Sequence, residues 1–88
     1  KKVLLMSNHG VLTTGQTVAE AFDELYYFER ACETYLTALS TNKKLKIVKD
    51  EIAEKTAQEW EDYSTNAQDL HLKAIRLILD KEDPSYKD

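Results

Sequence analysis

The sequence lacks the features that define several large protein classes. Cys32 is the only cysteine among the 88 residues, so no intrachain disulfide can form and the paired cysteines of a zinc ribbon are missing. No apolar run approaches the roughly 18 residues that a membrane span needs. A signal-peptide pattern, an internal repeat and a low-complexity tract are missing as well. These absences favour a reducing, cytoplasmic setting and predict no membrane partner.

The chain also lacks an excess of positive charge. The chain has 12 basic and 16 acidic residues, which gives a formal net charge of −4. A protein that binds nucleic acid needs a basic face to contact the phosphates. The composition therefore predicts no nucleic-acid partner.

The length and the first residues indicate part of a domain. At 88 residues the chain forms one domain at most. It begins with Lys1 and enters an apolar run almost at once, whereas natural termini usually lie at the surface. We therefore interpret residues 1–88 as the C-terminal part of a longer protein.

The first residues predict two short strands around a histidine. Residues 3–6 are a continuous apolar run, which is typical of a strand covered on both faces. Asn8 and Gly10 are turn formers on either side of His9. We expect strands over about 3–7 and 11–14, with His9 in the tight turn between them.

The strongest helix signal follows this turn. Thr17 and Glu20 form a capping box, in which the threonine hydroxyl accepts the glutamate amide and the glutamate side chain reaches back. The apolar residues after it recur at helical spacing and predict a helix over about 18–39. The stripe comprises Val18, Phe22, Leu25, Cys32, Leu36 and Leu39. Because so apolar a helix needs cover on more than one side, we expect the isolated chain to self-associate or to need its missing half.

Two further helices are expected. One runs over about 51–63 with Asp50 as its N-cap, and Ser64-Thr65-Asn66 breaks it. The other runs over about 67–82 and stops at Asp83-Pro84, because the residue before proline avoids helical geometry.

Two groups of charged residues have alternative interpretations. Glu29 interrupts the apolar stripe of the 18–39 helix, and either pairs with Arg30 or a nearby lysine or makes a polar contact at an interface. The polar segment 40–46 is either a solvated loop or an attractor for a phosphate-bearing ligand. Its basic residues are Lys43, Lys44 and Lys46.

The two histidines have different prospects as metal ligands. Imidazole suits zinc and similar ions, and Gly10 lets a ligand approach the backbone beside His9. A lone histidine after a strand is nevertheless more often a structural or surface residue. His71 has no histidine or cysteine at ligand spacing and is expected to be a packing or solvent-edge residue.

The run from Leu5 to Phe22 resembles the C-terminal block of the class II aldolase/adducin family. This block has an apolar strand, Asn-His-Gly, an apolar pair, a glycine and a helix that begins near Ala-Phe. The segment Tyr27–Glu33 continues the resemblance, and Leu79–Tyr86 is similar to the end of a bacterial branch of the family. The resemblance covers most of the chain.

The resemblance implies a fold and a metal site. The α/β fold would be the C-terminal portion of a three-layer α/β/α domain, here two short strands followed by about three helices, assembled as a homo-oligomer, usually a tetramer. A divalent metal, usually zinc, would be bound by three histidines, of which His9 is the last in the chain. The other two, from a His-x-His motif, and a glutamate acid/base would precede this sequence.

The function implied by the resemblance is that of a metal-dependent aldolase-type lyase or epimerase. The substrate would be a small molecule such as a sugar, a sugar acid or a related hydroxy-carbonyl compound, with the metal stabilising an enediolate as a Lewis acid. Without the other ligands, these residues alone are expected to be inactive. Tyr86 is a candidate catalytic residue, because a tyrosine near the C-terminus of some family members reaches a neighbouring active site, or else it anchors the tail. The alternative function is an adducin-like, non-catalytic interaction module.

Overall fold

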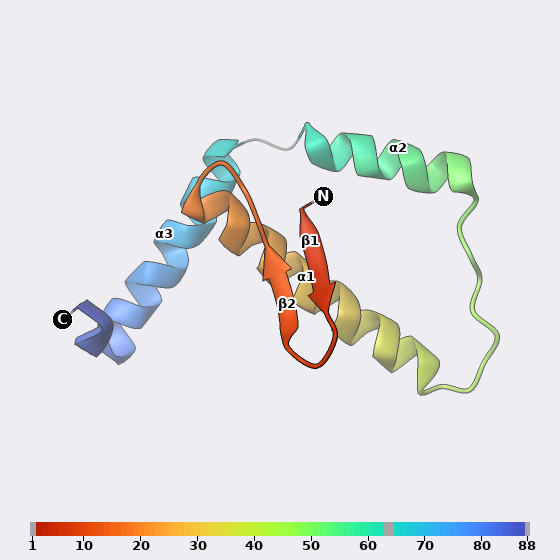
Figure 1. The fold of residues 1–88 in the computed structure, drawn as a ribbon, viewed down its shortest axis with the longest axis horizontal. Helices are drawn as coiled ribbons and strands as arrows, with labels where there is room; N and C mark the ends of the chain where they lie inside the picture. The colour runs from red at the N-terminus through yellow and green to blue at the C-terminus, as the bar shows by residue number, and fades with distance from the viewer. Residues whose placement is uncertain (1, 63–64, 88) are drawn as a thin grey trace.

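The computed structural model describes residues 2–62 and 65–87. These residues form two antiparallel strands, three α-helices and a final 3₁₀ turn, an arrangement compatible with the α/β class (Figure 1). Within the described ranges, none of the helices is long and apolar enough to cross a membrane. The elements are β1 (Val3–Met6), β2 (Gly10–Thr13), α1 (Val18–Leu39), α2 (Asp50–Glu61), α3 (Thr65–Glu82) and η1 (Pro84–Lys87).

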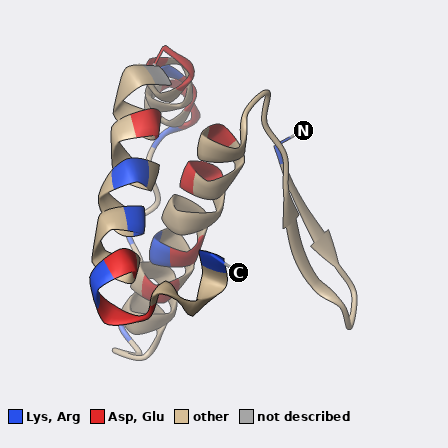
Figure 2. Ribbon diagram, turned by 90° about the vertical axis from the view of Figure 1, so that its left-hand side faces the viewer, with Lys and Arg blue, Asp and Glu red and all other residues tan. Residues whose placement is uncertain are grey.

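The strands pair as a hairpin that lies against the start of α1. Val3 pairs with Thr13 and Met6 with Gly10 across the ladder. The Thr13 hydroxyl then donates to the Ala21 carbonyl of α1 at 2.9 Å. Gly15 permits the close approach, because a Cβ atom at this position would lie 2.9 Å from the Ala21 nitrogen. Figure 2 shows the uncharged hairpin as a layer beside the charged helices.

The predicted capping box is present at the start of α1. The Thr17 hydroxyl accepts the Glu20 amide at 3.1 Å. The Glu20 carboxylate accepts the amide of Gln16 at 3.2 Å, one residue before the position that the sequence pattern suggests. The Glu20 amide, which has no partner within the helix, and the Gln16 amide, which precedes the helix, therefore both have a hydrogen-bond acceptor.

The prediction of Asp50 as an N-cap is wrong. Lys49 holds the extended N-cap conformation and makes no side-chain capping bond, while Asp50 is already the first residue of α2. An acidic residue in the first turn still interacts favourably with the helix dipole. The predicted end of this helix at Tyr63 and the first residue of the predicted break, Ser64, lie outside the described residues. The rest of that break is wrong, because Thr65 and Asn66 are the first residues of α3.

The core lies where α1 and α3 cross and is small. Ala19 is the only buried hydrophobic residue among those described, and Asp23 and Gln68 are buried beside it. The radius of gyration is 16.1 Å, against about 12 Å for a compact domain of this length. The accessible surface is 7971 Å², whereas a compact protein of this mass exposes about 5,300 Å². The helices therefore enclose little of their apolar surface.

The expectation that the first strand is covered on both faces is wrong for this chain. Leu5 is 70% exposed, and Leu4 beside it is also exposed. The reason is geometric, since one helix can cover only part of one face of a two-stranded sheet. The α1 stripe is likewise open at both ends, where Val18 is 78% and Leu36 is 64% exposed.

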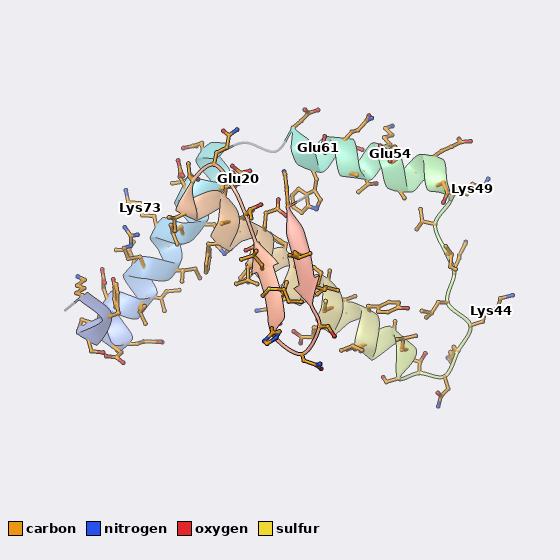
Figure 3. All side chains as sticks on the ribbon, viewed as in Figure 1. Glu20, Lys44, Lys49, Glu54, Glu61 and Lys73 are labelled. Carbon is orange, nitrogen blue, oxygen red and sulfur yellow. The ribbon has the colours of Figure 1, made fainter. Side chains whose placement is uncertain are left out.

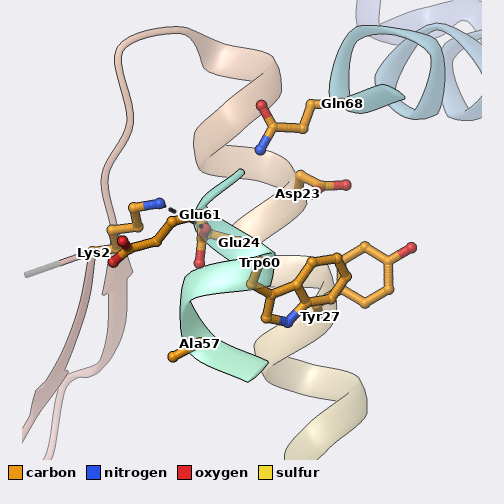
Figure 4. Close-up of a pocket in the computed structure, with 8 residues that line it drawn as sticks. All are labelled: Lys2, Asp23, Glu24, Tyr27, Ala57, Trp60, Glu61 and Gln68. Atoms are coloured by element: carbon orange, nitrogen blue, oxygen red, sulfur yellow. Dashed lines mark ion pairs between the residues drawn. The ribbon is translucent and has the colours of Figure 1, made fainter. Parts of the chain in front are cut away.

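The second helix stands apart from the other elements. A long connection leads to it from α1, and Figure 3 shows Lys44 and Lys49 projecting from this connection away from the rest of the chain. Trp60 near the end of α2 packs against Tyr27 of α1, with ring centroids 5.4 Å apart. This contact draws the end of α2 toward the end of the hairpin that carries Lys2, and the residues between them line a pocket (Figure 4).

Candidate functional site

The turn between β1 and β2 presents His9 to solvent. The His9 amide donates to the Met6 carbonyl at 3.0 Å, which closes the turn. Asn8 and Gly10 on either side have positive φ angles of 64° and 114°, a conformation that asparagine and glycine adopt at least cost. The residue types on either side of His9 are therefore the ones that the turn requires, and the histidine side chain is exposed at its tip.

The described residues do not by themselves assemble a metal centre. No group of three histidine, cysteine, aspartate or glutamate side chains within 2–62 and 65–87 is placed to hold a metal ion. A structural or catalytic zinc site needs at least three protein ligands. His9 is compatible with the role of a single ligand, because its imidazole is exposed on a fixed turn, but the donor set in these residues is incomplete.

Tyr86 lies far from His9 in the chain and contacts the end of α3. Its hydroxyl donates a hydrogen bond to Asp80, and Lys87 also pairs with the Asp80 carboxylate at 3.3 Å. The hydrogen bond from Tyr86 holds the pKa of Asp80 below its ordinary value and, in return, raises the pKa of Tyr86. The contacts of Tyr86 within this chain are those of a tail anchor.

A buried polar contact joins α1 to α3. The Nδ1 atom of His71 lies 2.7 Å from Oδ1 of Asp23, and both side chains are largely buried, with 20% and 7% of their surfaces exposed. The His71 ring also meets Tyr26 edge-on at 4.5 Å between centroids and Phe22 at 5.3 Å. His71 is therefore a packing histidine whose polar edge is satisfied by Asp23.

Sequence reasoning missed Asp23 and Gln68. Asp23 is four residues after Ala19, so both lie on one face of α1, and this is the face that α3 covers. The signal in the sequence was a small residue followed four positions later by an aspartate. This pattern predicts a buried polar contact only once His71 is known to lie beside Asp23, and His71 is 48 residues away in the chain.

The two groups of charged residues with alternative interpretations are both exposed. Arg30 pairs with Glu33 at 3.5 Å rather than with Glu29, and its guanidinium lies 5.2 Å from the centre of the Tyr26 ring. Glu29 and the three lysines of the 40–46 segment are all exposed to solvent. Their geometry is that of solvated surface charge.

Comparisons with known proteins match the region that contains the hairpin and most of α1. Residues 1–36 match the family model described as Class II Aldolase and Adducin N-terminal domain. A putative aldolase class 2 protein of Caulobacter vibrioides is 30% identical over 89 aligned positions, which cover the whole of this chain. These matches support the class II aldolase and adducin family for this chain. The family resemblance noted in the sequence is thereby confirmed.

Adducins and a further Drosophila melanogaster protein also match parts of this chain. Human beta-adducin is 45% identical over 40 residues, or 46% of this chain. The Drosophila melanogaster protein hu-li tai shao is 47% identical over 38 residues, or 43% of this chain. No solved structure gives a significant match.

Only some of the candidate residues lie in the part of the chain that the family model matches. His9 and Asp23 lie within the matched residues 1–36, whereas His71 and Tyr86 lie beyond them. The chain spans 35% of the length of the Caulobacter protein and 6% of human beta-adducin. It therefore represents about a third of the one relative and a small part of the other.

Proposed function

We propose that this chain is the C-terminal portion of a three-layer α/β/α domain that acts as a metal-dependent aldolase-type lyase or epimerase. The observation that carries the proposal is His9, which lies within the residues matched by the family and is exposed on a turn fixed by the Met6 carbonyl. Its substrate would be a sugar, a sugar acid or a related hydroxy-carbonyl compound. A bound divalent cation, with zinc as the first candidate, would supply Lewis acidity toward the substrate oxygens.

The role of this chain in that activity is to supply one ligand. His9 would be joined by histidines and an acid/base glutamate that are not among the 88 residues. The exposed apolar faces of β1 and α1 support the same view, since a larger sheet and further subunits would cover them. We therefore propose a homo-oligomer, a tetramer as the first candidate, in the cytoplasm, and no activity for these residues alone.

Metal analysis of the full-length protein tests the proposal. The wild-type protein, purified without chelator, should contain stoichiometric zinc or another divalent metal by mass spectrometry. The variant His9→Ala should bind the metal at least about tenfold more weakly, because losing a direct ligand costs no less than losing a supporting one. The matched control is Ser7→Ala, an exposed substitution in the same turn. Equal metal content in wild type and His9→Ala would refute the assignment.

The second candidate is an adducin-like interaction module without catalysis. It is favoured by the 45% identity to human beta-adducin over 40 residues. It is also consistent with the absence of a complete ligand set in the described residues. A full-length protein that binds no metal and cleaves no hydroxy-carbonyl substrate, while retaining its oligomeric state, would favour this candidate.

A further inference from the structure

A pocket of about 190 Å³ lies between the start of the hairpin and the three helices (Figure 4). It is separate from the turn of His9, because Lys2 lies at the open end of the hairpin and His9 at the closed end. Two aromatic rings and several polar side chains form its wall. The lining residues that carry the argument are Lys2, Asp23, Glu24, Tyr27, Trp60, Glu61 and Gln68.

The charge of the pocket is negative. The lining residues include three carboxylates and one ammonium group. The Lys2 ammonium lies 3.6 Å from the Glu24 carboxylate, and the Asp23 carboxylate lies 2.7 Å from the His71 ring. Glu61 has no ion-pair partner within the described part of the chain. An additional cation in the pocket would therefore be attracted by Glu61.

The amide of Gln68 supplies a second polar group to the pocket. Gln68 of α3 is only 9% exposed, and its side chain has no hydrogen-bond partner among the residues that the structure describes. Figure 4 shows this amide turned from α3 toward α1 across the pocket. The described residues contain no buried side-chain polar atom without a partner, so the amide atoms of Gln68 are accessible from the pocket. A ligand in the pocket can therefore donate to the side-chain oxygen of Gln68.

The aromatic side chains define the kind of cation. The Tyr27 and Trp60 rings are inclined at 55° with centroids 5.4 Å apart, so they form an angled apolar wall rather than a parallel stack. Aromatic faces attract cations, and the indole face does so most strongly. A planar guanidinium prefers to stack flat on a ring, whereas an alkylammonium fits an angled wall with its methylene groups. The volume of 190 Å³ equals roughly six water molecules, which suits a short alkyl chain.

We propose that this pocket binds an alkylammonium group, with its charge beside Glu61, one N–H donated to Gln68 and its methylene groups against Tyr27 and Trp60. Free amines and lysine side chains both offer this group. The proposal does not depend on His9 or on a metal. It would hold for a lyase and for an interaction module alike.

Trp60 makes the binding directly measurable, because it is the only tryptophan in the 88 residues. Its fluorescence should change saturably when n-butylammonium chloride is titrated into the full-length protein at constant ionic strength, and a Trp60→Phe variant should lack this change. Sodium butyrate and n-butanol, which match the probe in size but lack its charge, should have no saturable effect. A response to butyrate or butanol equal to that of butylammonium would overturn the proposal.

Variants test whether the charge of Glu61, rather than the negative charge of α2 as a whole, attracts the ligand. Glu61→Gln should weaken butylammonium binding roughly tenfold, since a charge-assisted hydrogen bond is lost. The matched control, Glu54→Gln, removes a carboxylate from the same helix outside the pocket and should bind like wild type. Gln68→Met keeps the volume but removes the acceptor and should also weaken binding. Unchanged affinity in both pocket variants, with circular dichroism confirming the fold, would contradict the proposal.

A second titration separates the two sources of the ligand. The probe is Nα-acetyl-lysine amide, which presents the same ammonium on a peptide-like group. Binding at least as tight as that of butylammonium identifies a lysine side chain as the occupant. Binding of butylammonium alone identifies a free amine, and binding of neither probe refutes the site.

Discussion

Asp23 and His71 join the first and the last helix through a contact of 2.7 Å that is largely shielded from water. The two residues are 48 positions apart, and the aromatic rings of Phe22 and Tyr26 pack around the histidine. The contact lies between α1 and α3, which form the only substantial pair of α-helices among the described residues.

The first prediction concerns this pair. Asp23→Ala should lower the free energy of unfolding by about 1–3 kcal/mol, because the buried His71 nitrogen loses its partner. The double variant with His71→Ala should reveal a coupling energy of about 0.5–3 kcal/mol in a mutant cycle. Urea denaturation provides the measurement. The control Asp69→Ala, on the exposed side of α3, should change the free energy of unfolding little. A coupling energy near zero would show that the contact between Asp23 and His71 does not stabilise the fold.

The two glycines should respond to alanine for different reasons. In Gly15→Ala the new Cβ atom would lie 2.9 Å from the Ala21 nitrogen, so the hairpin has to move from α1 at a cost of about 1–3 kcal/mol. In Gly10→Ala the space is open but φ is +114°, so the cost is backbone strain of about 1–2 kcal/mol. Thermal unfolding measures both losses. Crosspeaks between Thr13 and Ala21 in nuclear magnetic resonance spectra should shift only in Gly15→Ala, and their persistence there would contradict the steric explanation.

The tail contact predicts a pH dependence. The Tyr86 hydroxyl lowers the pKa of Asp80 from its ordinary 3.8. The folded-state pKa is thus depressed, so the contribution of the contact is present above pH 3.8 and is lost as the pH falls through the lower folded value. Tyr86→Phe should return the pKa of Asp80 toward 3.8, as measured by carboxyl carbon resonance titration. Tyr35→Phe, at an exposed position on α1, should leave it unchanged, and an identical titration in Tyr86→Phe would exclude the hydrogen bond.

At alkaline pH the same contact predicts the opposite dependence, in which its contribution to stability falls as the pH rises. The pKa of Tyr86 is raised from 10.0, with its hydrogen bond to Asp80 as the largest cause. The contribution is therefore present below pH 10.0 and is lost as the pH rises through the higher folded value. The ultraviolet absorbance of the tyrosinate should show one group titrating later in wild type than in Asp80→Asn.

The open apolar faces predict self-association of the isolated chain. Leu5 is 70% exposed on a strand that has a free edge, and such edges pair readily with other chains. Sedimentation velocity should find oligomers for the wild-type chain and a shift toward monomer for Leu5→Lys. Lys44→Glu, on the exposed connection to α2, should sediment like wild type. A monodisperse wild-type monomer that melts cooperatively would contradict the prediction.

Local sequence signals account for the parts of the structure that depend on near neighbours. The bond from the Glu20 amide to Thr17 was predictable because the two residues are one helical turn apart. The turn at Asn8 and Gly10 was predictable because few residue types adopt positive φ. The N-cap of α2 was not, since Asp50 favours both the cap and the first turn.

The sequence could not reveal which surfaces meet across the chain. Asp23 and Gln68 look like ordinary surface residues until α3 is placed against α1. Leu4 and Leu5 look like core residues, and the pattern of apolar residues cannot say whether the covering element belongs to the same 88 residues. The proposed metal site likewise depends on residues that the sequence does not contain. His9 is present, but the described residues do not complete a set of metal ligands.

The way α2 is attached has a consequence for hydrogen exchange. This helix has no buried residue, and its packing on the rest of the chain centres on Trp60 and Tyr27. Amides of α2 should therefore exchange through local opening long before those around Ala19 and Asp23, which should stay protected until global unfolding. Because α2 supplies Trp60 and Glu61, an occupied pocket would slow exchange in α2 selectively. Ligand binding and the folding of one helix would then be a single equilibrium.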